Sequence, residues 1–149
     1  MGRIEKSIEI KAPLEKVWEA LAFDRHPEFF EEYQSAEYTS EVHTPEDKYR
    51  VGASARITTK HKEEVDINII ESLKNKKITY RVQGMPAARN IIGSFILKST
   101  GAGTEITITT DYEMPWSILG KVIDKLLGQR MLEKDTVKTL DKMKSILEK

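Results

Sequence analysis

The fold is decided by residues 3–18, which read RIEKSIEIKAPLEKVW. Up to Ile10 the apolar residues alternate with polar ones, which is the period of a half-buried strand. From Pro13, a residue that suits the first turn of a helix, the period becomes helical. The apolar positions of this helix are Leu14, Val17, Trp18 and Leu21. A second short helix is expected over residues 24–33, interrupted by Pro27, so one strand and two short helices open the chain.

Two hairpins are predicted within residues 34–112, where short strands alternate with turns. In the first, pairing residues whose numbers sum to 147 places Ile67 opposite Tyr80 and Asp66 opposite Arg81. Apolar then meets apolar and opposite charges meet, which is the pattern that stabilises neighbouring strands. A strand over residues 51–60 fits beside this hairpin, with inward residues Ala53, Ala55, Ile57 and Thr59.

The second hairpin turns at residues 101–103, and its partners have numbers that sum to 203. This register places Phe95 opposite Ile108 on one face and Lys98 opposite Glu105 on the other. A shift by one residue would place Lys98 opposite an isoleucine. Both hairpins therefore belong to an antiparallel sheet with one face in water.

One long helix is predicted from about Ser117 to Glu148. Its apolar residues recur at spacings of three, four or their sums. They are Trp116, Leu119, Ile123, Leu126, Leu127, Val137, Leu140 and Leu147. At ~1.5 Å per residue such a helix is about 48 Å long and overhangs the sheet. Gly120 and Gly128 each weaken its first half by about 1 kcal/mol relative to alanine, so we expect that half to bend or move.

The composition predicts a single domain, residues 1–149, in the cytoplasm. Since 24 basic residues balance 24 acidic ones, the net charge gives no reason to expect nucleic acid as a partner. The absence of cysteine excludes a disulfide framework, a thiol nucleophile and a thiolate metal site. Residues 1–6 lack the apolar run of a signal peptide, and no stretch has the ~20 apolar residues of a membrane-spanning helix. We therefore expect no integral membrane association.

In their order along the chain, these segments resemble the START-like (SRPBCC) superfamily, and within it the polyketide cyclase/dehydrase and coenzyme Q-binding branch. The resemblance covers essentially the whole chain and rests on residues 7–18, residues 26–30 (HPEFF), Val51-Gly52, residues 103–106 (GTEI) and the long final helix. It implies an α+β helix-grip fold, in which a curved seven-stranded antiparallel sheet wraps around the C-terminal helix and two short helices follow the first strand. It also implies an apolar cavity between sheet and helix, where members of the group bind lipids, sterols, quinones, polyketides or hormones.

Small residues on the inward face independently favour such a cavity, because larger ones would be needed to reach the helix. They are Ala53, Ala55, Gly93 and Thr110, and the alternative is that they mark close contact between helix and sheet. The residues expected to bind the ligand are Phe29, Phe30, Ala55, Ile57, Ile67, Tyr80, Met85, Asn90, Phe95, Ile108, Thr110, Tyr112, Trp116, Leu119, Ile123, Leu126, Leu127 and Arg130. The Arg130 side chain either meets an anion or several hydrogen-bond acceptors in the cavity, or holds its charged end in water. The same two alternatives apply to Lys6.

The sequence predicts no catalytic residue, metal or cofactor. His26, His43 and His61 lack the spacing of metal ligands, and we expect all three to be solvated. The predicted function is binding, with or without transport, of a hydrophobic or amphipathic small molecule such as a lipid, quinone or polyketide-like compound. One alternative is a polyketide cyclase/dehydrase-type enzyme in the same cavity, although no base falls clearly on the inward face. A second alternative is a protein-interaction module, and the oligomeric state stays open.

Overall fold

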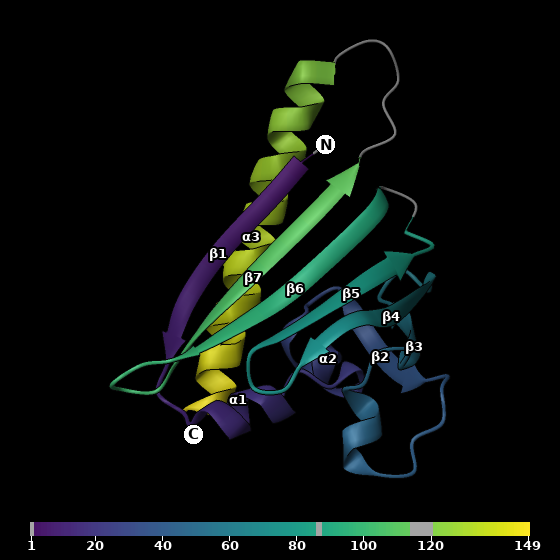
Figure 1. Ribbon diagram of the computed structural model, residues 1–149. Helices are drawn as coiled ribbons and strands as arrows, with labels where there is room; N and C mark the ends of the chain where they lie inside the picture. Colours follow the sequence, from purple (N-terminus) through teal and green to yellow (C-terminus); the bar gives the residue numbers. More distant parts are fainter. Residues whose placement is uncertain (1, 86–87, 114–120) are drawn as a thin grey trace.

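The computed structural model of the chain describes residues 2–85, 88–113 and 121–149, and the side chains of all of them except 121–126 (Figure 1). In these residues, seven strands form one antiparallel sheet in the order β1-β7-β6-β5-β4-β3-β2. The strands are β1 (Gly2–Ile10), β2 (Tyr33–Tyr38), β3 (Ser54–Thr59), β4 (Glu64–Leu73), β5 (Lys77–Gln83), β6 (Arg89–Ser99) and β7 (Thr104–Glu113). The helices are α1 (Leu14–Glu19), α2 (His26–Phe29), α3 (Lys121–Leu147) and two 3₁₀ helices, Phe23–Arg25 and Pro45–Lys48.

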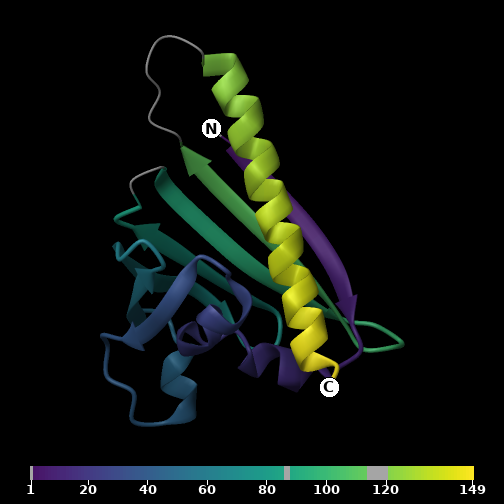
Figure 2. The same cartoon turned by 180° about the vertical axis from the view of Figure 1, so that it is seen from behind.

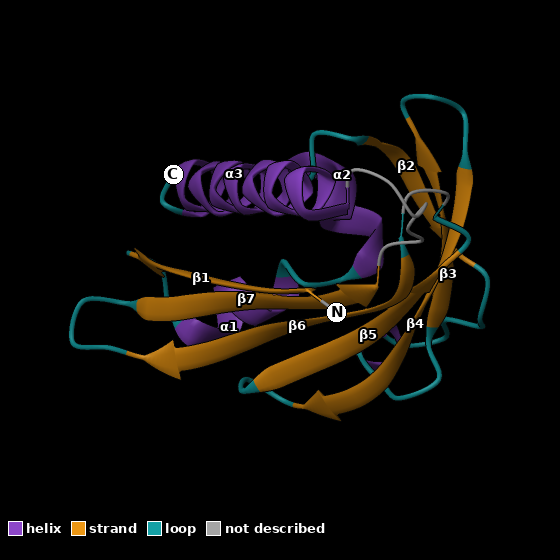
Figure 3. Cartoon of the chain, turned by 90° about the horizontal axis from the view of Figure 1, so that it is seen from above, coloured by secondary structure: helices purple, strands orange, loops and turns teal. Residues whose placement is uncertain are grey.

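The sheet curves around the last helix. Seen from above, α3 lies over β1 and β7, while β2 and β3 bend up at the far side with α2 between them and the helix (Figure 3). The C-terminal end of α3 is fixed where β1 meets α1: the Lys144 ammonium donates to the Glu9 carbonyl (3.0 Å), and the Lys11 N–H donates to the Glu148 carboxylate (2.8 Å). The predicted α+β helix-grip fold, with its seven-stranded antiparallel sheet, is confirmed.

The core lies between the sheet, the short helices and the C-terminal half of α3. Leu140, Met143 and Leu147 of α3 are buried in the same cluster as Trp18 and Phe23. None of the described helices combines the length and the hydropathy that crossing a lipid bilayer requires. The fold therefore buries the C-terminal end of α3 in the core.

The opening strand and first helix form as predicted, and the second helix forms but is shorter than predicted. Pro13 is the extended residue that precedes α1, and Ile4 and Ile10 are buried. Residues 24–33 were expected to form one interrupted helix; instead a 3₁₀ turn leads into the four residues of α2, and β2 already begins at Tyr33. Pro27 lies in the first turn of α2, where its missing N–H costs nothing, and the extended backbone of Phe30 ends the helix.

The register of the β4–β5 hairpin differs from the prediction. Ile67 pairs with Val82 and Ile69 with Tyr80, which is a shift of two residues, and a bulge follows Ile69. A shift of two keeps every side chain on its own face, so the alternation of apolar residues cannot distinguish the two registers. The turn itself decides between them, because Asn75 takes up the left-handed conformation (φ 62°).

As a result, Asp66 does not face Arg81. It lies opposite Arg56 of β3, whose Nε is 3.1 Å from the carboxylate. The β6–β7 register is confirmed from Ser99 to Ile92, including the pair Phe95 and Ile108. The strand beside the first hairpin is confirmed as β3.

The single apolar stripe predicted along α3 is wrong in its middle. Leu140 and Leu147 face the core, but Leu127 and Val137 are exposed. Val137 is ten positions after Leu127. Over that distance, spacings that are sums of three and four do not determine which side of the helix a residue faces. Trp116 and Leu119 lie outside the described residues, as do the side chains of Ile123 and Leu126.

Candidate functional site

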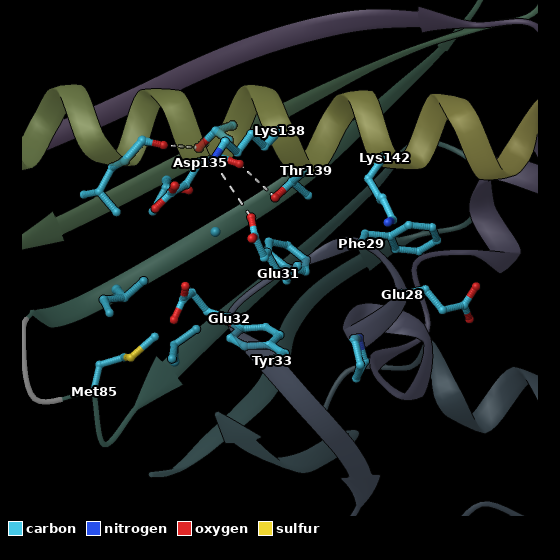
Figure 4. A pocket seen from close by; sticks show the side chains of 18 of the residues that line it. Glu28, Phe29, Glu31, Glu32, Tyr33, Met85, Asp135, Lys138, Thr139 and Lys142 are labelled. Atoms are coloured by element: carbon cyan, nitrogen blue, oxygen red, sulfur yellow. Dashed lines mark hydrogen bonds and ion pairs between the residues drawn. The ribbon is translucent and has the colours of Figure 1, made fainter. Parts of the chain in front are cut away.

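An open cavity of about 890 Å³ lies between the concave face of the sheet, α2 and α3 (Figure 4). Its floor is formed by β5, β6 and β7, one wall by α2 and the start of β2, and the other wall by the middle of α3. The apolar and aromatic residues that line it are Pro27, Phe29, Phe30, Tyr33, Tyr80, Val82, Met85, Ala88, Ile91, Tyr112 and Leu132.

The cavity exists because two tyrosine rings lie over glycines. Tyr80 pairs directly with Gly93, and a Cβ placed on Gly93 would lie 2.6 Å from Cζ of the Tyr80 ring. Tyr112 pairs with Gly2 in the same way, and its ring occupies the position of a Cβ there. Aromatic rings that cover glycines on a neighbouring strand are a known device of β-sheets. Thr110 lies between the two tyrosines and has only a short side chain. The side chains of the floor therefore do not fill the space between the sheet and α3.

An aromatic cluster supports the cavity from below, and it contains His26. The prediction that His26 is solvated is wrong: 1% of the residue is exposed. Its ring centroid lies 5.1 Å from that of Phe30 and 6.0 Å from that of Tyr80, both of which line the cavity. The Nε2 atom lies 3.3 Å from the Leu21 carbonyl, whereas Nδ1 has no hydrogen-bond partner among the described residues.

Burial lowers the pKa of His26 from 6.5 to about 4, which leaves the imidazole neutral at pH 7. The Nε2–H then donates to Leu21, and Nδ1 carries a free lone pair. Nothing in the sequence pattern indicated this burial, because a histidine before a proline in a turn is typical of an exposed position. His43 and His61 are exposed, as predicted.

Three tyrosines bring phenol groups to the cavity: Tyr33, Tyr80 and Tyr112. Burial raises the pKa of Tyr33 to about 12 and also raises the pKa values of Tyr80 and Tyr112, so all three stay protonated at neutral pH. None of the hydrogen bonds among the described residues involves these three hydroxyls. They are therefore available to donate to a hydrogen-bond acceptor in the cavity.

The two threonine hydroxyls on the helix wall are already engaged. Thr136 donates to the Leu132 carbonyl (2.7 Å), and Thr139 donates to the Asp135 carbonyl (3.0 Å). Each is a bond to the carbonyl four residues earlier, which leaves the threonine methyl group to face the cavity. At Leu132, Thr136 and Thr139 the helix wall thus offers apolar contact, whereas the floor offers hydrogen-bond donors.

Charged residues surround the mouth of the cavity. Figure 4 shows the carboxylate of Glu31 directed toward Lys138, at 4.0 Å, with Glu32 and Lys142 farther along the rim. Ion pairs as exposed as this one contribute little to stability. The rim carries both signs of charge, and it can face water while an apolar molecule occupies the interior.

The structure separates the predicted ligand-binding residues into groups. Those that line the cavity are Phe29, Phe30, Tyr80, Met85, Thr110 and Tyr112. Those buried in the core elsewhere are Ala55, Ile57, Ile67, Phe95 and Ile108. Those on the surface are Asn90, Leu127 and Arg130. Trp116 and Leu119, with the side chains of Ile123 and Leu126, are outside the described residues.

The buried group misses the cavity because the short helices fill that half of the sheet. Phe23 stacks on Tyr38, which pairs with Ala55, so that this region is closed. Arg130 is exposed, and the Lys6 side chain extends from β1 to α3, where its Nζ lies 3.8 Å from the Glu133 carboxylate. Asn90 donates to the Glu113 carboxylate (2.8 Å).

Several lining residues were not predicted. They include Tyr33, Val82, Ile91, Leu132, Thr136 and Thr139. Leu132, Thr136 and Thr139 recur at helical spacing, which could have indicated one face of α3, but the two threonines do not stand out as apolar. In the described residues, no group of three or more histidine, aspartate or glutamate side chains is arranged to hold a metal ion.

The family model described as polyketide cyclase/dehydrase and lipid transport matches residues 1–148. The chain belongs to this family. The resemblance inferred from the sequence is thereby confirmed at the level of the family. A search of curated proteins finds no match.

Solved structures of the same fold include an aromatase/cyclase, Zhui, from Streptomyces sp. R1128, with a TM-score of 0.75 and 17% identity over 99% of this chain and 93% of that one. A protein from Mesorhizobium loti has a TM-score of 0.73 and 18% identity over 99% and 97% of the two chains. A protein from Thermus thermophilus has a TM-score of 0.72 and 17% identity over 97% and 95%. At these identities the similarity shows the fold alone.

Proposed function

We propose that the chain binds a hydrophobic or amphipathic small molecule in the cavity between the sheet, α2 and α3. The observation that carries this proposal is the 890 Å³ cavity itself, with its aromatic walls and its floor of unengaged phenol groups. Cavities of about 300–1,000 Å³ with apolar walls and a few polar groups are typical of small-molecule sites. Membership of the family supports a hydrophobic ligand or cyclase chemistry, and the candidate ligands are a lipid, a quinone or a polyketide-like compound.

The walls suggest how such a ligand lies. Its apolar body packs against Phe29, Phe30 and Ile91, and a carbonyl or ether oxygen accepts from the hydroxyl of Tyr80 or Tyr112. Any charged group stays at the rim, because a charge moved to the floor would lose its hydration without a partner. The protein that carries this cavity is proposed to work in the cytoplasm.

Binding is favoured over catalysis by the surroundings of Tyr80. None of the hydrogen bonds among the described residues joins its hydroxyl to a carboxylate or an imidazole, so no general base is coupled to it. The neutral His26 lies behind the wall and does not line the cavity. A cyclase acting on a polyketide-like chain would need a base within reach of the substrate. The carboxylates that line the cavity, among them Glu31 and Asp135, are the groups present for that role, but none of them is hydrogen-bonded to Tyr80.

The test is a titration of the purified protein, extracted with organic solvent, with fluorescent fatty-acid and quinone analogues. Thr139→Trp places an indole in the cavity and is expected to weaken binding at least tenfold. Val137→Trp, on the exposed side of the same helix, is the matched control and is expected to leave binding unchanged.

Saturable binding that Thr139→Trp leaves intact would show that the ligand lies elsewhere. Should Thr139→Trp fail to fold, Ile91→Trp fills the cavity from the floor. Turnover of a polyketide-like substrate by the extracted protein would favour the cyclase instead.

A further inference from the structure

The outer side of α3 carries large apolar side chains in water. Leu127 is 54% exposed, Met131 66% and Val137 42%. In Figure 2, no other described element lies on the side of α3 that faces away from the sheet. Scattered apolar residues are common on protein surfaces, but these three share one side of one helix. The same side carries three exposed cations, Arg130, Lys134 and Lys138. We call these six residues the outer stripe of α3.

The outer stripe is continuous along the helix, and its charged residues are all positive. At 100° per residue its six members fall within an arc of about 120°, and they extend over about 17 Å of helix. Within residues 127–138 the acidic residues lie off the arc: Glu133 turns toward Lys6 of β1, and Asp135 lines the cavity. Asp141 lies on the arc just beyond this segment, and Lys138 also pairs with Glu31 at 4.0 Å. Although the whole chain has no net charge, this surface is therefore locally basic as well as apolar.

We propose that the outer stripe docks the protein on the surface of an anionic lipid bilayer. A helix side that combines basic and large apolar residues is suited to the interface, where the apolar side chains enter the acyl boundary and the cations meet lipid phosphates. Each basic side chain near an anionic surface strengthens binding about fivefold. The contact is peripheral and needs no membrane-spanning helix.

The outer stripe lies next to the mouth of the cavity, so docking on a bilayer could serve ligand transfer. Lys138 belongs both to the stripe and to the lining of the cavity, so the mouth opens beside the docking surface. An apolar ligand could then pass between bilayer and cavity without crossing water. This part of the inference rests on the proposed function, whereas docking itself does not.

A bilayer fits the stripe better than a second copy of the chain. Three apolar side chains are too few for the roughly 1,200–2,000 Å² that a stable protein interface buries. A symmetric pairing through this side would also bring the cations of the two copies together, which disfavours association.

The experiment is flotation of the full chain with vesicles of phosphatidylcholine alone and with 30% phosphatidylserine, in 0.05 M and 0.5 M NaCl. We expect binding to the anionic vesicles at low salt and little at high salt, because salt screens the contact. Arg130→Gln with Lys134→Gln is expected to weaken binding about 25-fold, from about fivefold for each cation removed. Leu127→Gln with Met131→Gln is expected to weaken it as well, but to leave its salt dependence unchanged.

The matched control is Lys74→Gln with Lys76→Gln, which removes two exposed cations from the β4–β5 turn and is expected to change binding less than twofold. Equal losses in the control, equal binding to neutral vesicles, or no binding at all would overturn the proposal. So would a dimer in sedimentation equilibrium that Arg130→Gln with Lys134→Gln dissociates while vesicles stay unbound.

The probe titration in vesicle-free solution separates this proposal from the proposed function. Variants of the stripe should bind the fluorescent probe like the unmodified chain. Vesicle binding without probe binding would support docking and refute the cavity, and probe binding without vesicle binding would do the reverse.

Discussion

Acidification from pH 7.5 to pH 4.5 is expected to destabilise the protein through one side chain, His26. Burial holds its pKa at about 4 in the folded state, against 6.5 when exposed. Unfolding therefore takes up a proton between these two pH values, and the unfolded state gains from each step of acidification. The stabilisation that comes from a neutral His26 is complete above about pH 6.5 and is lost as the pH falls toward 4.

The size of the effect follows from the two pKa values. Each pH unit in this window corresponds to about 1.4 kcal/mol. The contribution of His26 to the free energy of unfolding should fall by about 1.4 kcal/mol at pH 5.5 and by about 2.6 kcal/mol at pH 4.5. Such a loss is a large part of the stability of an ordinary domain.

Urea unfolding at pH 4.5, 5.5, 6.5 and 7.5 measures the loss, with His26→Gln as the reference. Glutamine does not titrate, and its side-chain amide can still donate to the Leu21 carbonyl. Carboxylates titrate in both proteins, so the difference between the two curves isolates His26. Parallel curves would refute the reasoning, as would an NMR titration in which the His26 ring of the folded protein becomes protonated near pH 6.5.

Two further predictions concern packing and join the cavity and vesicle tests above. Gly93→Val should displace the Tyr80 ring and destabilise the protein by about 1–3 kcal/mol, as overpacked sites do, whereas Ile96→Val on the outer side of β6 should be almost neutral in thermal unfolding. Met143→Ala should cost about 2–5 kcal/mol because the side chain is fully buried, while Met131→Ala should change stability by less than about 0.5 kcal/mol; equal costs would place the core on the wrong side of α3.

The sequence was sufficient for the order of elements and for the faces of the strands. Alternation identified the buried side of β1, and paired charges with paired apolar residues fixed the β6–β7 register. It was insufficient for the β4–β5 register, where the choice depended on the conformation of Asn75 and on a bulge after Ile69. Backbone conformation at one turn residue has no counterpart in the apolar pattern.

The helix α3 shows a different limit. Its C-terminal half is amphipathic in the ordinary sense, and Leu140 and Leu147 were placed correctly. Farther toward its start, Leu127 was assigned to the cavity on the assumption that a large apolar residue must be covered, and Arg130 because it lies on the same predicted stripe. A helix that overhangs its sheet does not meet this condition, because part of it has no sheet to pack on.

The cavity depends on pairs of residues, which is why composition alone misplaced part of it. Ala55 and Gly93 looked equivalent as small inward residues, yet only Gly93 lines the cavity. Above Ala55, the ring of Tyr38 meets Phe23 from the 3₁₀ turn and fills the space. Above Gly93, the ring of Tyr80 lies down on the glycine, and α3 is too far away to fill what is left. A small residue therefore opens a site only where its large neighbour folds over it and no third element packs directly on it. Among the described residues, Gly93 meets this condition and Ala55 does not.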